Sequence, residues 1–254
     1  MGLFVISNSP FATKEQLMKF FSTEGGIYKF MTRLWDMIKL NFLWLICSLP
    51  IVTIGASTIA AFTITLKMVE EKEGYVARAF FKAFKANFKQ GIVIGPITVI
   101  FAAVLYLDFT LGKQYIGFVI LGILSAFLFG IAIIYTYPLL ARYENKLLKT
   151  IRNSMRIAMR YFGRTIFLVV VLVIEYIIFF RFTNITLLIG ILVGPATMIL
   201  TVSGFAMYFF REIEKAGGVT TKKTEEDLYN EEIERETQNA LKAENKNISE
   251  DENQ

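Results

Sequence analysis

The sequence predicts an all-α, polytopic membrane protein with six transmembrane helices and interfacial amphipathic helices. Of its 254 residues, 54% are hydrophobic and the mean hydropathy is +0.50, which is too apolar for a soluble protein that covers its core with polar surface. Nearly every residue between Leu40 and Phe210 belongs to an apolar run. The charges that separate these runs are mainly basic and form two blocks, Lys67 to Lys89 and Arg142 to Arg164.

Four apolar runs are long enough to cross the membrane as helices, which takes about 20 residues for about 30 Å of hydrocarbon. They cover residues 91–111, 115–140, 165–182 and 184–210. The earlier run from Leu34 to Met68 is either one long helix bent at Pro50 or two helices, 34–49 and 51–68. We predict two, because only an even number of crossings places the N-terminal basic residues on the same side as both basic blocks.

The charge distribution predicts that both termini lie in the cytoplasm. Residues 67–90 carry six basic residues and residues 141–164 carry seven, whereas the opposite turns offer only Lys113 and Arg181. Basic loops remain on the cytoplasmic side, so we expect a multi-pass protein of the bacterial cytoplasmic membrane. The first dozen residues lack the regions of a cleavable signal peptide, and the first span is therefore expected to direct insertion.

Composition divides the chain into three parts. Residues 1–33 are a cytoplasmic segment with a predicted amphipathic helix, 34–216 form the transmembrane domain, and 217–254 are a cytoplasmic tail. Residues 1–218 carry 22 lysines and arginines against 11 acidic residues, whereas residues 219–254 carry 5 against 11. This acidic, weakly hydrophobic tail is predicted to be disordered and functionally neutral.

The residue inventory argues against an enzyme. The chain has no histidine, which removes imidazole bases and ligands, and it has no P-loop pattern for ATP. Its one cysteine, Cys47, lies inside the first span without a partner. We therefore expect no catalytic residue, no metal, no cofactor and no nucleic-acid partner.

A weak internal repeat precedes the membrane entries. The tetrapeptides that begin at Lys39, Lys85 and Met159 superpose, and the residues before them place an apolar stripe on one helical face and basic residues on the others. Such helices anchor to anionic headgroups or dock a partner protein, and both roles are compatible. The candidate partner-interface residues are Phe80, Phe81, Phe84, Phe88, Ile151 and Met155.

Irregular and polar positions occur inside the predicted spans. Gly-Pro-x-Thr sequences begin at Gly95 and Gly194, and such breaks are either packing kinks or one half each of a transporter site. Glu175 is the one acidic residue deep within an apolar run. It predicts either a structural hydrogen bond to Thr or Tyr of a neighbouring span, or an intramembrane site for proton coupling or substrate contact.

The runs Leu34 to Leu45, Leu49 to Ala56 and Glu73 to Gln90 resemble the YesL-like family of bacterial membrane proteins. The resemblance extends over about residues 20–215. It implies six spans and an accessory role in importing oligosaccharides, because genes of this family lie beside ABC-type permeases, solute-binding proteins and glycoside hydrolases. It defines no catalytic residues.

The leading hypothesis is an accessory subunit that associates with the permease subunits of an oligosaccharide ABC importer, and through them with an ATPase and a solute-binding protein. Neither basic block contains the Glu-Ala-Ala loop by which a permease holds its ATPase, so the chain is not expected to replace a permease. The alternatives are a small secondary carrier built around Glu175, Pro96 and Pro195, and a membrane scaffold or sensor.

Overall fold

The computed structural model describes residues 26–72, 75–112, 115–181 and 183–215. Within these residues every regular element is a helix and no strand is found, which confirms the all-α prediction. Most of the N-terminal segment 1–33 and the entire tail 217–254 lie outside the described residues.

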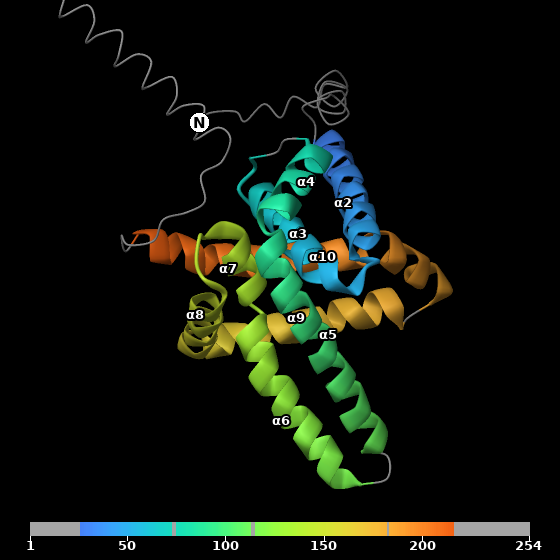
Figure 1. Ribbon diagram of the computed structural model, residues 1–254. Coiled ribbons are helices and arrows are strands. Elements are labelled where there is room, and N and C mark those ends of the chain that lie inside the picture. Colours follow the sequence, from blue (N-terminus) through green and yellow to red (C-terminus); the bar gives the residue numbers. More distant parts are fainter. Residues whose placement is uncertain (1–25, 73–74, 113–114, 182, 216–254) are drawn as a thin grey trace, which may run out of the picture.

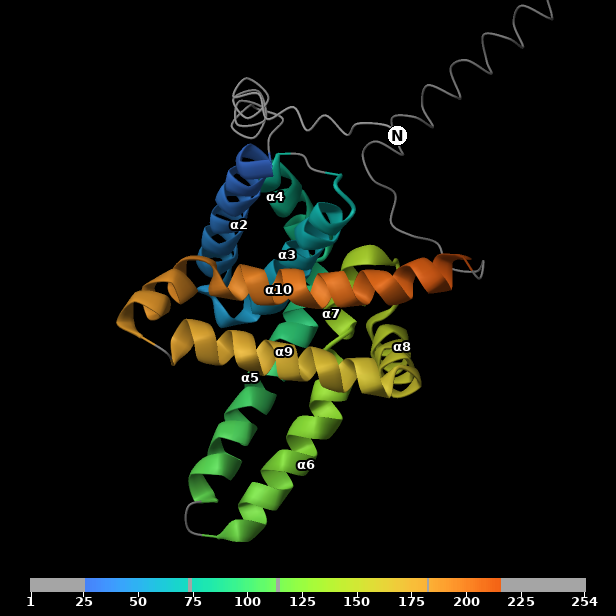
Figure 2. The same cartoon turned by 180° about the vertical axis from the view of Figure 1, so that it is seen from behind.

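The helices are joined by short connections. They are α2 (Gly26–Ser48), the 3₁₀ turn η1 (Ile51–Thr53), α3 (Ile54–Val69), α4 (Val76–Ala86), α5 (Phe88–Leu111), α6 (Ile116–Ile133), α7 (Thr136–Arg142), α8 (Leu147–Arg160), α9 (Phe162–Phe180) and α10 (Asn184–Lys215). In Figures 1 and 2, α3 lies near the centre, α9 and α10 run side by side across the body, and the α5–α6 hairpin points away from the other elements.

Helix α3 is the centre of the packing. It contacts α2, α4, α5, α7 and α10, and 61% of the most apolar stretch of Ile51–Val69 is buried, whereas Gly122 is the one buried residue of α6. Its close contact with α5 depends on glycine, since a Cβ atom on Gly55 would lie 2.2 Å from the carbonyl oxygen of Gly91. Small residues at a helix contact let two backbones approach in this way.

Among the residues that the structure describes, five segments are long and apolar enough to cross a membrane, which supports a multi-pass membrane protein but not the full count of six. They are Ile51–Val69, Phe88–Leu111, Ile116–Arg142, Phe162–Arg181 and Asn184–Lys215. The predicted first span, 34–49, is the part of α2 that carries Asp36 and Lys39 directly after Arg33. These charges make α2 less apolar than the other spans.

The chain does turn at Pro50, as the two-helix interpretation predicted. Helix α2 ends at Ser48, and Pro50 caps η1. The Ser48 and Ser57 hydroxyls lie 2.6 Å apart across this turn, and Trp44 Nε1 donates to Thr58 Oγ1 at 3.1 Å. The single bent helix is therefore excluded.

Other boundaries differ from the predicted ones. The predicted span 115–140 is two helices, α6 and α7, separated by a turn at Ile134 and Tyr135. The side chain of Tyr135 is fully buried there and packs edge-on against Phe209. The predicted break between an N-terminal amphipathic helix and the first span, at residues 33–34, does not occur, because α2 runs through it without interruption.

Candidate functional site

Helices α4 and α8 are the amphipathic helices predicted in the two basic blocks, and each packs one face against the protein. Helix α4 contacts α2 and α3, and α8 contacts α6 and α7. Asn87 separates α4 from α5, and Tyr161 separates α8 from α9 in the same way. When these two residues are superposed, Val76, Phe80 and Ala83 align with Thr150, Ser154 and Ile157. All six side chains are buried, so the repeat is reproduced in the burial pattern of these two copies.

The first copy of the repeat behaves differently. Its equivalent residue, Asn41, lies inside the continuous helix α2 and is completely buried. No separate amphipathic helix precedes this position within the described residues. The repeat in three-dimensional structure is therefore limited to α4 and α8.

The outward-facing sectors of α4 and α8 also correspond. Phe81 and Met155 occupy equivalent positions and are 46% and 38% exposed. Arg78 aligns with Arg152, and Lys82 aligns with Arg156. All four basic side chains are exposed. Each helix therefore presents an apolar residue beside two basic ones at the entrance to a span.

The structure separates the six predicted interface residues into two groups. Phe80 has no exposed surface, and Phe84 packs partly buried against the same cluster, with their rings 6.3 Å apart. Ile151 is half-buried. Phe81, Phe88 and Met155 remain exposed and are therefore the accessible members of the set.

These exposed residues continue into the α5–α6 hairpin. Phe88 is the first residue of α5 and is followed one turn later by the exposed Ile92. Beyond α8, the rings of Phe162 and Phe127 lie 6.0 Å apart and join the start of α9 to α6. Exposed aliphatic and aromatic side chains follow along both helices of the hairpin. Exposed apolar side chains of the hairpin thus follow α4 through α5 and lie beside α8 through α6.

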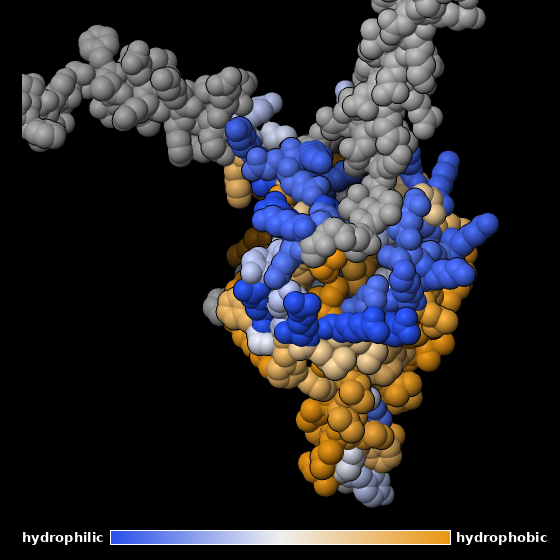
Figure 3. All heavy atoms as spheres, turned by 90° about the vertical axis from the view of Figure 1, so that its left-hand side faces the viewer, coloured by the Kyte–Doolittle hydropathy of each residue, from blue (hydrophilic) through white to orange (hydrophobic). Residues whose placement is uncertain are grey.

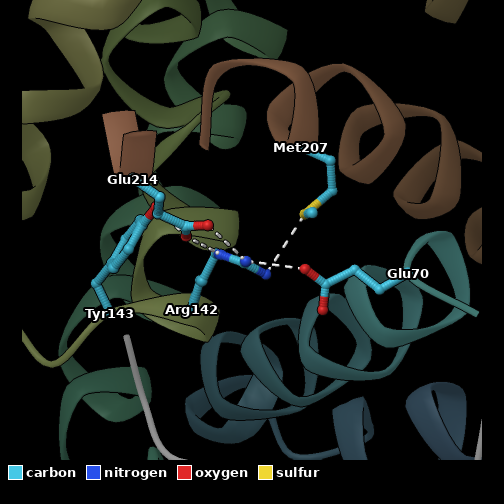
Figure 4. A network of polar contacts seen from close by, with 5 residues as sticks. All are labelled: Glu70, Arg142, Tyr143, Met207 and Glu214. Atoms are coloured by element: carbon cyan, nitrogen blue, oxygen red, sulfur yellow. Dashed lines mark hydrogen bonds and ion pairs between the residues drawn. The ribbon is translucent and has the colours of Figure 1, made fainter. Parts of the chain in front are cut away.

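A network centred on Arg142 joins three helices near the basic blocks (Figure 4). Arg142, at the end of α7, makes a two-point ion pair with Glu214 of α10, with Nε–Oε1 at 2.6 Å and Nη2–Oε2 at 3.0 Å. Its Nη2 also lies 2.8 Å from Oε1 of Glu70 at the end of α3. The Arg142 side chain is only 14% exposed, so removal of one partner would leave a poorly solvated charge without its counter-ion.

Tyr143 completes the network by donating from its hydroxyl to Glu214 at 2.9 Å. Burial, together with this hydrogen bond, raises the pKa of the Tyr143 hydroxyl, which therefore remains a donor. The network could not be recognised in the sequence because its members are far apart along the chain. The available signal was the presence of acidic residues, Glu70 and Glu214, at the ends of otherwise apolar helices.

Glu175 has one hydrogen bond, accepted by its Oε1 from Thr201 Oγ1 of α10 at 2.6 Å. Its Oε2 is buried and has no partner in the described part of the chain. Gly95, before Pro96, contacts Gly55 of α3 instead. Of the residues that the carrier alternative combined, Glu175 and Pro195 thus belong to the α9–α10 pair, whereas Pro96 belongs to the α3–α5 pair.

Asn41 compensates for the backbone hydrogen bond that Pro195 removes from α10. Proline has no N–H, so the carbonyl of Ile191, four residues earlier, loses its helical donor. Asn41 Nδ2 donates to the carbonyl oxygens of Ile191 and Leu192, each at 2.9 Å. This proline is therefore a packing feature between α2 and α10.

Comparison with known proteins gives two matches. A family model described as "Protein of unknown function, DUF624" matches residues 37–109. The chain is also 25% identical over 143 residues to "Uncharacterized protein YesL" of Bacillus subtilis (strain 168), a stretch that covers 54% of this chain and 68% of that relative. No solved structure matches. The two matches confirm the predicted resemblance to the YesL-like family.

Proposed function

We propose that this YesL-like chain is an accessory membrane subunit that binds the permease subunits of an oligosaccharide ABC importer and supports their assembly. The association with an importer rests on the resemblance to the YesL-like family. The observation that carries the binding role is the exposure of Phe81, Phe88 and Met155 on or beside the two basic helices, next to the α5–α6 hairpin that projects from the other helices (Figure 1). Exposed aromatic residues on a fixed scaffold are common anchors of protein interfaces.

The proposal includes six crossings, with α2 as the first and both termini in the cytoplasm. Helix α2 runs antiparallel to α3 along most of its length. Arg33 contacts the Met68 carbonyl at one end and Ser48 contacts Ser57 at the other. Helix α2 therefore covers the same depth as α3, whose segment is apolar enough to cross, and counting it returns the chain to the side of both basic blocks.

The importer proposal is tested by co-purification with the two permeases. Replacing Phe81 and Phe88 by Ala removes exposed apolar anchors while leaving the core residues Phe80 and Phe84 in place, and we expect the complex to weaken by about 2 kcal/mol, or roughly 30-fold. The matched control replaces the exposed Lys85 and Lys89 by Gln in the same segment. Full retention of the complex and of uptake by a normally inserted Phe variant would refute docking through this surface.

One observation favours the secondary carrier as a second candidate, namely the unpartnered Oε2 of Glu175. A carboxyl group within a span is costly unless it is paired or functional. Glu175→Gln preserves an acceptor for Thr201 and removes the ionisable group. If the purified chain alone, in vesicles, shows proton-coupled sugar uptake that this variant abolishes, the carrier function is correct and the accessory role is not.

A further inference from the structure

Two arginines at the junction of α8 and α9 are held by aromatic rings. The Arg164 guanidinium carbon lies 4.0 Å from the centre of the Tyr208 ring. Arg160 and Arg164 also lie 5.7 Å and 5.9 Å from the centre of the Tyr161 ring. The two cations, from different helices, therefore share one aromatic platform.

The platform itself is fixed by the core. The Tyr161 hydroxyl donates to Glu212 Oε2 at 2.6 Å, and its ring stacks on the buried Phe209 with 4.5 Å between ring centres. The hydrogen bond to Glu212 raises the pKa of Tyr161, so the hydroxyl remains protonated. The arginines are thus orientated by groups that do not neutralise them.

Both guanidinium groups keep their hydrogen-bond donors available. Within residues 26–215, apart from the undescribed positions, neither Arg160 nor Arg164 makes an ion pair with a carboxylate, and both are exposed. Gly163, between them, has no atom within 4 Å of the position that a Cβ would occupy. A ligand with an anionic group therefore has open access to both cations.

The position of Arg160 and Arg164, at the junction of α8 and α9, indicates the class of ligand. The apolar segment of α9 begins at Phe162, and Phe162, Ile166 and Phe167 are exposed directly beyond the arginines. Tyrosines and arginines at the end of a span lie at the level of lipid headgroups. Figure 3 shows hydrophilic residues above a continuous hydrophobic region on this side of the molecule.

We propose that Arg160 and Arg164 bind the phosphate of an anionic phospholipid, with an acyl chain lying along Phe167, which follows Arg164 by about one turn of α9. Guanidinium groups suit this role because they form paired hydrogen bonds with phosphate oxygens. The exposed apolar residues favour a lipid over free phosphate, because inorganic phosphate has no acyl chain to pack against them. This site does not depend on the importer function.

The test uses the full-length chain, delipidated in detergent and titrated with phosphatidylglycerol, phosphatidylcholine or inorganic phosphate, with the thermal midpoint as the measure of binding. We expect phosphatidylglycerol alone to stabilise the protein. The double variant Arg160→Gln, Arg164→Gln should weaken that binding by on the order of tenfold. The matched double variant Arg152→Gln, Arg156→Gln also removes two positive charges, but outside the proposed site. It should weaken the binding less than about threefold.

A charge-neutral variant separates the site from general surface charge. Tyr208→Leu keeps both arginines and removes the ring beneath Arg164, so we expect a several-fold loss of phosphatidylglycerol binding. The proposal is overturned if the two double-arginine variants lose binding equally, if Tyr208→Leu loses none, or if phosphatidylcholine or inorganic phosphate stabilises the protein as well as phosphatidylglycerol does.

Discussion

Asn41 donates its side-chain amide to the carbonyl oxygen of Ile191 at 2.9 Å, across 150 residues of sequence. That carbonyl is the one that Pro195 leaves without a helical donor. Asn41 is completely buried, so the bond connects α2 to the break in α10 without access to water. This relationship leads directly to a test in which one substitution compensates for another.

Asn41→Ala should lower the free energy of unfolding by about 2 kcal/mol, because it leaves a buried acceptor without a donor. Pro195→Ala restores an N–H to α10, so the cost of Asn41→Ala should be smaller by about 1 kcal/mol in that background. Thermal unfolding of the four purified proteins measures this difference. Equal costs in both backgrounds would show that Asn41 acts through packing alone.

Arg142→Gln should destabilise the protein by about 2 kcal/mol or more, because it leaves two partly buried carboxylates, Glu70 and Glu214, without their cation. Glu70→Gln removes one contact and should cost about 1 kcal/mol. The exposed Arg152→Gln serves as the control and should change stability by no more than about 0.5 kcal/mol. Thermal midpoints in detergent give the order, and an Arg142 variant as stable as the control would contradict it.

Gly55→Ala should separate α3 from α5 and cost about 2 kcal/mol, because the added methyl group would overlap the backbone of Gly91. Gly117→Ala is the matched control, since nothing lies within 4 Å of the position of its Cβ. This control should be neutral or slightly stabilising, because alanine favours a helix over glycine. Comparison of the yield and thermal midpoint of the two proteins checks the prediction.

The proposed topology predicts the labelling of cysteines placed in a variant that lacks Cys47. A cysteine at the exposed Lys85 or Arg152 should be protected from an impermeant thiol reagent in intact cells. One at Tyr115, which is 63% exposed at the start of α6, should be labelled. All three should react after the cells are opened, and labelling of position 85 in intact cells would contradict the orientation.

The parts of the fold that depend on local composition were predictable from the sequence. The long apolar runs, the turn at Pro50 and the two basic amphipathic helices each follow from a pattern within a few turns of chain. The alignment of Asn87 with Tyr161 was also visible locally, and the structure reproduces it as two helix junctions.

The candidate site was predictable only in part, because periodicity identifies an apolar face but not what covers each side of it. Phe80 and Phe81 both belong to the predicted stripe, yet α3 covers the first and leaves the second exposed. The network of Arg142 with Glu70 and Glu214 was not predictable, since it depends on how α3, α7 and α10 meet.

The position of α3 has a consequence for biosynthesis. This helix leaves the ribosome early, whereas α10, which contributes Ser203 to the 2.6 Å hydrogen bond with Thr65, is translated 138 residues later. During that interval Thr65 lies in the bilayer without its partner in α10. A chain that stops before α10 is therefore expected to be less stable in the membrane than the full-length protein, because α3 then lacks one of the helices that cover it.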